Sequence, residues 1–129
     1  MRILVADDYA SVRKGISTLL AALDGVEVCG EACNGEEAVT LAIQLTPDLI
    51  ILDVTMPVLD GLGAAKKIRN VMPDLPILIL SMHDGREMIR AAHEAGAHGF
   101  VSKSEIGDAL SKAVFALLQG RTVFPDGLA

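Results

Sequence analysis

The segment LIILDVTMPVLDG (residues 49–61) decides the fold of this chain. It opens with four apolar residues, 49–52, ends that run abruptly at Asp53, and continues into turn-forming residues. A short, continuous apolar run bounded in this way predicts a β-strand that is buried on both faces. Runs of the same kind occupy residues 3–6 and 77–80. The sequence therefore predicts three central strands of one sheet.

Outward from these runs, apolar strands alternate with amphipathic helices five times. The expected strands are 2–6, 26–32, 48–52, 76–80 and 99–102, and the expected helices are about 11–23, 35–45, 61–72, 85–95 and 105–119. Strand–helix alternation with short links predicts a parallel sheet covered by helices on both faces, a three-layer α/β/α fold. The second strand alternates in polarity and the fifth is short, so both are expected at edges. This predicts the (βα)5 flavodoxin-like strand order 2-1-3-4-5.

Three helices carry sequence signals at their first turn. Asn34 with Glu37, and Asp84 with Glu87, have the spacing of a capping box. Ser104 is placed to cap the last helix. We therefore expect side-chain hydrogen bonds at the start of these helices.

Composition limits the class of protein. The chain has 129 residues, 51% of them hydrophobic, which suits one globular domain with a full core. No apolar run approaches a membrane span and no signal peptide is visible, so a cytoplasmic location is expected. A net charge of −6 argues against direct nucleic-acid binding by this domain. Cys29 and Cys33 are too far apart along a strand to bridge, and are expected as buried free thiols. Residues 1–120 are expected to form the domain, and 121–129 to begin a linker or tail.

Polar side chains follow the predicted strands. Asp7 and Asp8 follow the first strand, Asp53 the third, Ser81 the fourth and Lys103 the fifth. The carboxyl ends of parallel strands meet at one edge of the sheet, so these groups are expected to converge there. Three carboxylates repel one another, and an all-oxygen ligand set favours Mg²⁺ as the balancing ion. An aspartate in such a pocket can act as a nucleophile and form an aspartyl phosphate.

Four stretches together resemble the signature of response-regulator receiver domains, of the CheY-like fold and NarL/FixJ type. They are LVADD (4–8), LIILDVTMPVLDG (49–61), ILILSMHD (77–84) and GFVSKS (99–104). The resemblance covers nearly all of residues 2–120. It implies a switch of the two-component system, in which a sensor histidine kinase transfers a phosphoryl group from phosphohistidine to Asp53. It also implies Mg²⁺ bound by Asp8, Asp53 and the Thr55 backbone carbonyl, with Asp7 acting through water.

The resemblance assigns further roles around the acceptor. Ser81 and Lys103 contact the phosphate, and Phe100, in place of a frequent Tyr, occupies the aromatic switch position. Phe100 is expected to turn inward as Ser81 moves toward the phosphate. Thr55 and His83 occupy positions that tune the lifetime of the phosphate. The surface formed by the fourth helix, fifth strand and fifth helix is expected to change on phosphorylation.

The resemblance also implies partners and leaves alternatives. A homodimer is expected on phosphorylation, with transcription regulated through a C-terminal helix-turn-helix domain beyond this chain. No turnover enzyme is expected. A haloacid-dehalogenase-type phosphatase is disfavoured because the second Asp of D-x-D-x-T is absent after Asp53. A flavin carrier is disfavoured by the 3% aromatic content and the acidic loop after the first strand. A receiver-like module that binds partners without phosphorylation is the remaining alternative.

Overall fold

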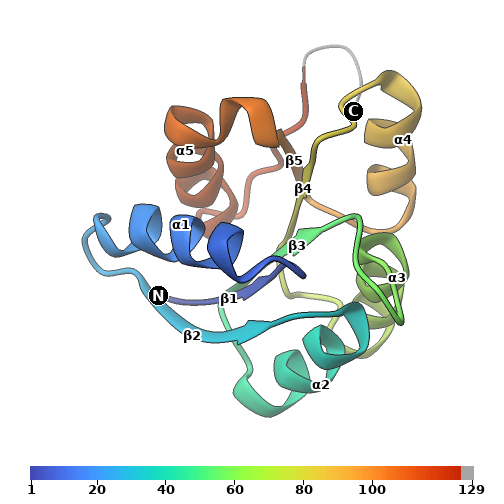
Figure 1. The fold of residues 1–129 in the computed structure, drawn as a ribbon, viewed down its shortest axis with the longest axis horizontal. Helices are drawn as coiled ribbons and strands as arrows, with labels where there is room; N and C mark the ends of the chain where they lie inside the picture. The colour runs from blue at the N-terminus through green and yellow to red at the C-terminus, as the bar shows by residue number, and fades with distance from the viewer. Residues whose placement is uncertain (126–129) are drawn as a thin grey trace.

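A computed structural model describes residues 1–125 of the chain. Five strands alternate with five helices along the chain (Figure 1). The elements are β1 (Arg2–Ala6), α1 (Ala10–Ala21), β2 (Glu27–Ala32), α2 (Gly35–Leu45), β3 (Leu49–Asp53), α3 (Gly61–Val71), β4 (Ile77–Ser81), α4 (Arg86–Glu94), β5 (Gly99–Ser102), a 3-10 turn η1 (Lys103–Glu105) and α5 (Ile106–Leu118). All ten predicted helices and strands are confirmed, and no end is displaced by more than two residues.

The five strands form one parallel sheet in the order β2-β1-β3-β4-β5, as predicted. The strand ends differ from the prediction in one useful way. β3 and β4 each run one residue further, so Asp53 and Ser81 are the last residues of their strands. The backbone of both residues is therefore held by the sheet, and their side chains are fixed more firmly than loop residues would be.

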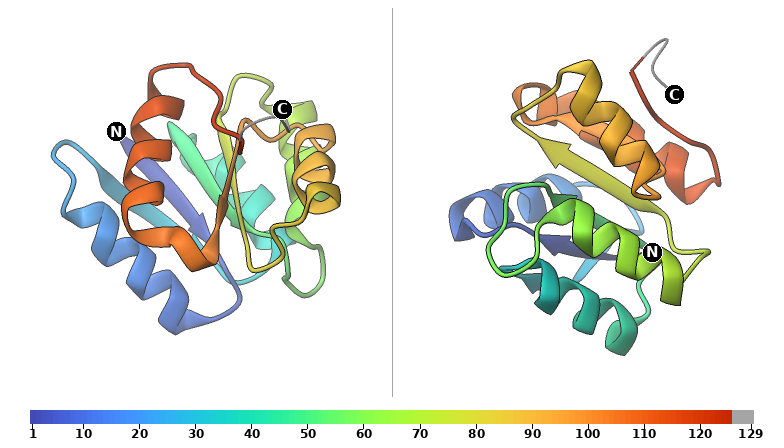
Figure 2. Two further views of the ribbon diagram at one scale, coloured as in Figure 1. Left: turned by 90° about the horizontal axis from the view of Figure 1, so that it is seen from above. Right: turned by 90° about the vertical axis from the view of Figure 1, so that its right-hand side faces the viewer.

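The sheet separates two apolar cores because successive side chains of a strand point to opposite faces. Leu4, Ile50 and Ile79 pack against α2, α3 and α4, whereas Ile3, Ile51 and Leu78 pack against α1 and α5. Figure 2 shows α1 and α5 on one side of the sheet and the other three helices on the opposite side. Each central strand is thus covered on both faces, which is why its sequence is apolar throughout.

Only one of the three expected helix caps forms. Asn34 accepts a hydrogen bond from the Glu37 amide at 2.7 Å, as predicted. The prediction for Asp84 is wrong: Gly85 precedes α4 without a side-chain cap, and Asp84 accepts a bond from Ser102 instead. The prediction for Ser104 is also wrong, because an extra 3-10 turn precedes α5 and Ser102 caps that turn.

Two further expectations need correction or comment. Both cysteines are free, as predicted, but Cys33 is exposed rather than buried and Cys29 is half-buried. Residues 121–125, named here the return segment, were expected to start a linker. In the structure they turn back after Gly120 and run beside β5 (Figure 2). Val123 makes a parallel bridge to Gly99 there. Residues 126–129 lie outside the described part of the chain.

His98 ties β4 to the segment that enters β5. Its Nδ1 accepts a hydrogen bond from the Ile77 amide at 3.1 Å, and its backbone N–H donates to the Ile77 carbonyl at 2.8 Å. The Arg69 Nη1 atom lies 3.3 Å from its Nε2. Burial, and then the charge of Arg69, lower the pKa of His98 below its usual value of 6.5. The ring is therefore neutral in the folded protein, as its acceptor role requires.

Acid should weaken this contact. Because the folded pKa lies below the unfolded value of 6.5, the unfolded chain binds more protons between the two values. Stability contributed by His98 is complete above about pH 6.5 and is lost as the pH falls below it. We expect His98→Asn, whose side-chain oxygen can accept the same amide, to reduce the fall in unfolding free energy between about pH 6.5 and 5. Urea titrations at each pH would show this, with His83→Asn as the exposed-histidine control. Equal slopes in both variants would contradict it.

Candidate functional site at the carboxyl edge of the sheet

The residues predicted to form a site meet at one edge of the sheet, at the ends of β1, β3, β4 and β5. Asp7 follows β1 and is fully buried, while Asp53 is 5% exposed and Ser81 is 1% exposed. These are three of the few buried polar residues among those described. Buried polar groups are costly unless they are paired, so their collection at one place points to a function.

Lys103 lies between two of the carboxylates. Its Nζ atom is 2.8 Å from Asp7 Oδ2 and 3.0 Å from Asp53 Oδ1, and its side chain is only 12% exposed. Lys103 comes directly after β5, so the sheet brings it to a carboxylate from β1 and one from β3. One cation among three carboxylates leaves the site with formal charge −2 (3 − 1 = 2).

Burial and neighbouring charges shift the pKa values of Asp53 and Lys103. Burial raises the pKa of Asp53 and outweighs the hydrogen bond from Lys103, while the neighbouring Asp7 raises the Asp53 pKa further. Burial alone would lower the pKa of Lys103, but its hydrogen bonds with Asp7 and Asp53 overcome this and raise it. Lys103 is thus firmly charged, and Asp53 is more basic than an ordinary aspartate. A more basic carboxylate is the better nucleophile.

Asp8 completes an oxygen-lined group that fits a divalent cation. Ligand atoms of Asp7, Asp8 and Asp53 all lie within 4.8 Å of one another. Asp8 Oδ1 is buried and makes no hydrogen bond within residues 1–125. Asp7 is different, because its Oδ1 accepts from the Tyr9 amide at 2.9 Å and its Oδ2 accepts from Lys103. The residues present therefore fit Mg²⁺, with Asp8 and Asp53 better placed as direct ligands than Asp7.

Ser81 keeps its hydroxyl hydrogen available. Its Oγ accepts a bond from the His83 amide at 2.9 Å, which leaves the O–H free to donate. The side chain of His83 itself is exposed, as is Thr55 in the loop after β3. Phe100 is 3% exposed and packs with Ile89 and Ala92 in the core beneath α4. The aromatic ring is thus already buried in this structure.

The loop after β3 is shaped by close backbone contacts. The Leu59 amide bonds the Pro57 carbonyl at 2.7 Å, a three-residue turn that holds Val58 at φ 69°. Gly61 then donates to the Val54 carbonyl at 2.8 Å, while its Cα lies against the Asp53 carbonyl. A Cβ at Gly61 would lie 2.0 Å from that carbonyl oxygen. Gly61 therefore allows α3 to begin immediately beside the candidate acceptor.

Two side chains, those of Arg13 and Asp84, support the site in ways that the sequence does not predict. Arg13 in α1 donates through Nη1 to the Asp7 carbonyl at 2.7 Å and through Nε to Glu31 at 3.0 Å, which fixes the end of β1. Asp84 accepts from Ser102 Oγ at 3.0 Å and so joins the loop before α4 to the end of β5. No local motif marks either contact. Asp84 lies four residues after the predicted end of the fourth strand, whereas Arg13 lies seven residues after the first strand, inside α1.

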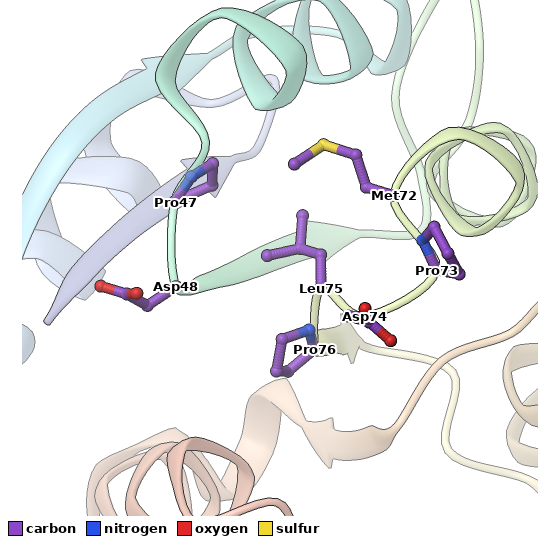
Figure 3. Close-up of a pocket in the computed structure, with 7 residues that line it drawn as sticks. All are labelled: Pro47, Asp48, Met72, Pro73, Asp74, Leu75 and Pro76. Carbon is purple, nitrogen blue, oxygen red and sulfur yellow. The ribbon is translucent and has the colours of Figure 1, made fainter.

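A hollow at the opposite edge of the sheet offers a contrast. It lies where the chain enters β3 and β4, and Figure 3 shows Leu75 between Pro47 and Met72 at its centre. Of its two carboxylates, Asp48 is engaged by the Arg2 amide at 2.7 Å. No Lys or Arg lines this hollow. The carboxylates that lie together with a buried cation are those at the carboxyl edge of the sheet.

Comparison with known proteins identifies the family of this chain. Residues 3–115 match the response regulator receiver domain family. The chain belongs to that family. The receiver is 34% identical over 128 residues to the transcriptional regulatory protein LnrK of Bacillus subtilis, covering 99% of this chain and 58% of LnrK. It is 43% identical over 116 residues to a protein-glutamate methylesterase/protein-glutamine glutaminase of Methanosarcina acetivorans, covering 88% of this chain and 33% of that protein.

Solved structures give the same result. A LuxR-family two-component response regulator from Aurantimonas superposes with a TM-score of 0.93 at 36% identity, covering 98% of this chain and 91% of that one. The isolated receiver domain of RcsB from Salmonella enterica, solved with the phosphomimetic BeF3−, gives 0.89 at 28% identity, covering 99% and 95%. The receiver spans 58% to 62% of the length of LnrK and of two other curated regulators that it matches. None of the helices in residues 1–125 has the length and apolarity to cross a membrane.

Proposed function

We propose that this receiver is a phosphorylation switch and that Asp53 is its phosphoryl acceptor. The observation that carries the proposal is the position of Asp53, buried between the Lys103 ammonium at 3.0 Å and a carboxylate group that fits Mg²⁺. An Asp53 oxygen attacks the phosphorus of a phosphohistidine, the P–N bond breaks, and the imidazole leaves with that electron pair and takes up a proton. Mg²⁺, when bound, supplies positive charge that offsets the phosphoryl oxygens.

The surrounding residues act on the transferred group. Lys103 neutralises a phosphoryl oxygen, and the free hydroxyl hydrogen of Ser81 donates to another. Asp8, Asp53 and the Thr55 carbonyl would hold the metal ion, and Asp7 would contribute through water. Asp7 also keeps Lys103 in place. Thr55 lies two residues after Asp53, His83 lies two residues after Ser81, and both are exposed. From these positions they can influence attack by water on the aspartyl phosphate.

The switch has a donor and an output in this proposal. A sensor histidine kinase in the cytoplasm supplies the phosphoryl group, and Phe100 with α4, β5 and α5 carries the change to a homodimer. Residues 1–120 form the receiver domain, and the chain after 120 leads to a DNA-binding helix-turn-helix domain in the full-length protein. Support for the output comes from the transcriptional regulators that this chain matches over about half their length. The receiver itself performs no turnover reaction.

The decisive test is intact-protein mass after incubation with acetyl phosphate and Mg²⁺. Wild type should gain one phosphoryl group, while Asp53→Ala and Asp53→Asn should gain none. Sedimentation of the same samples should show a dimer only in the modified wild type. If wild type gains no mass while a reference receiver reacts, the alternative of a module that binds partners without phosphorylation is favoured.

Metal binding gives a second, independent prediction. Mg²⁺ at one hundred times its dissociation constant should raise the unfolding free energy of wild type by about 2.7 kcal/mol. Asp8→Ala should abolish this gain and should also make the metal-free protein more stable, because it removes one of three crowded carboxylates. Denaturant titrations with and without Mg²⁺ would measure both effects. Asp24→Ala, which removes an exposed carboxylate far from the site, should keep the full response to Mg²⁺.

A further inference from the structure

The return segment joins all three elements of the α4, β5 and α5 face. It leaves α5 through Gly120, at φ +84°, and the Arg121 amide bonds the Ala116 carbonyl at 3.0 Å. It then pairs with β5: the Phe100 amide donates to the Val123 carbonyl at 2.8 Å, and the Val123 amide donates to the His98 carbonyl at 3.0 Å. A segment that directly follows the receiver is thus hydrogen-bonded to the backbone of Phe100.

Phe124 extends the segment from β5 to α4. Its ring meets the His93 ring edge-on, with centroids 5.2 Å apart and an interplanar angle of 76°. Phe124 also packs on the core that contains Phe100 and Ile89, and it lines the same groove as both. Within residues 1–125, α4 packs mainly on β5. The return segment therefore adds an outer contact to a helix that has few others.

Lys103 connects this arrangement to the phosphoryl site. It follows β5 directly, three positions after Phe100, and contacts Asp53 at 3.0 Å. In the proposed function the Lys103 ammonium contacts a phosphoryl oxygen, so it must move from its place beside Asp53 Oδ1 when Asp53 is modified. Because Lys103 directly follows β5, this movement acts on the end of that strand. β5 is held on one side by the buried strand β4 and on the other by two hydrogen bonds to the return segment. The hydrogen bonds to the return segment are more exposed than those to β4, so they open first.

We infer that the return segment is a strap whose release from β5 and α4 transmits modification of Asp53 to the chain that follows. The inference rests on the proposed function, because it takes phosphorylation of Asp53 as the trigger. The strap is closed in the unmodified protein and holds α4 against β5. Modification loosens it, which frees residues 121–125 and exposes the groove beside Phe100. Linkage requires the converse: opening the strap by substitution must favour the modified state.

Hydrogen exchange on the whole 129-residue chain tests the strap first in the unmodified protein. Val123→Pro removes the N–H that donates to His98, and Phe124→Ala removes the ring that meets His93. Exchange of the Phe100 amide and of α4 should rise roughly three- to tenfold in both variants, as expected for the loss of a contact of this size. Phe115→Ala, an exposed phenylalanine on α5, and Thr122→Ala are the matched controls and should change neither. Unchanged exchange in Val123→Pro and Phe124→Ala overturns the inference.

Exchange after treatment with acetyl phosphate and Mg²⁺, with mass measured on the same samples, tests the transmission. Wild type should gain one phosphoryl group and show faster exchange at Phe100 and residues 121–125, and Val123→Pro should be phosphorylated faster than Thr122→Ala. A phosphoryl gain with unchanged exchange of the strap overturns the inference and leaves the proposed function intact. The absence of any phosphoryl gain overturns the proposed function, and the trigger of the strap with it, whatever the unmodified variants show.

Discussion

Replacing Lys103 with Met is expected to lower the unfolding free energy by about 3 kcal/mol at pH 7 without Mg²⁺. Within residues 1–125 the ammonium is the one cation that pairs with the carboxylates of Asp7 and Asp53, at 2.8 and 3.0 Å, and both carboxylates are almost fully buried. Removing one partner of a buried ion pair leaves the other charges without compensation, which costs far more than losing a surface pair. Denaturant titration would measure the loss.

The pH dependence of this variant follows from Asp53. Its pKa is already raised in the folded protein, so the folded state binds the proton at a higher pH than the unfolded chain does. The destabilisation should therefore shrink as the pH falls through the folded pKa and the carboxylate becomes neutral. Mg²⁺ should also restore part of the loss. Lys66→Met, at an exposed position of α3, should change stability by less than about 0.5 kcal/mol. Equal effects of the two substitutions would contradict the role of Lys103.

Gly61→Ala is expected to be at least as damaging, at about 3 kcal/mol or more. The added Cβ would lie 2.0 Å from the Asp53 carbonyl oxygen and 2.8 Å from its carbon. Both atoms belong to the backbone of a buried strand, so no side chain can move aside to make room. Either the end of β3 or the start of α3 must shift. Asp53 is the last residue of β3, and the rate of phosphorylation should fall together with stability.

Gly15→Ala provides the matched control. Gly15 lies in the exposed part of helix α1, where a Cβ would meet nothing within 4 Å. The same substitution there should stabilise the protein by about 0.5–1 kcal/mol, because alanine favours a helix over glycine. Thermal and denaturant unfolding of both variants would establish the contrast. A mild effect at Gly61 would mean that the loop after β3 is more adaptable than its contacts suggest.

The fold and the position of the site followed from residues whose signals are local. Continuous apolar runs predict central strands, and parallel topology then brings Asp8, Asp53 and Lys103 to one edge although they are distant in sequence. The pattern works because each of the central strands β1, β3 and β4 is buried on both faces and therefore cannot tolerate a polar residue before its end. Asp53 and Ser81 end the apolar runs of their strands, and both are still buried.

The features that sequence could not supply depend on contacts between distant segments. Asp84 has the spacing of a helix cap, but its carboxylate bonds to Ser102, eighteen positions away. The pairing of Val123 with Phe100 likewise spans more than twenty residues, and its sequence resembles an ordinary linker. Arg13 supports Asp7 through a backbone carbonyl, which no residue type announces. In the first two cases a tertiary contact overrode the local signal, and in the third there was no local signal.

The pairing of Val123 with β5 also determines how this sheet could join others. A strand with free N–H and C=O groups can recruit a strand from a second molecule, and growth into a fibre requires such a strand at both sides of the sheet. Here residues 121–125 occupy one side, and β2 forms the other, where Glu27 and Glu31 point outward. Two molecules that paired through their β2 strands would leave no uncovered strand for a third molecule to join. Polymerisation by strand addition is therefore blocked by geometry as long as the side of β5 stays covered.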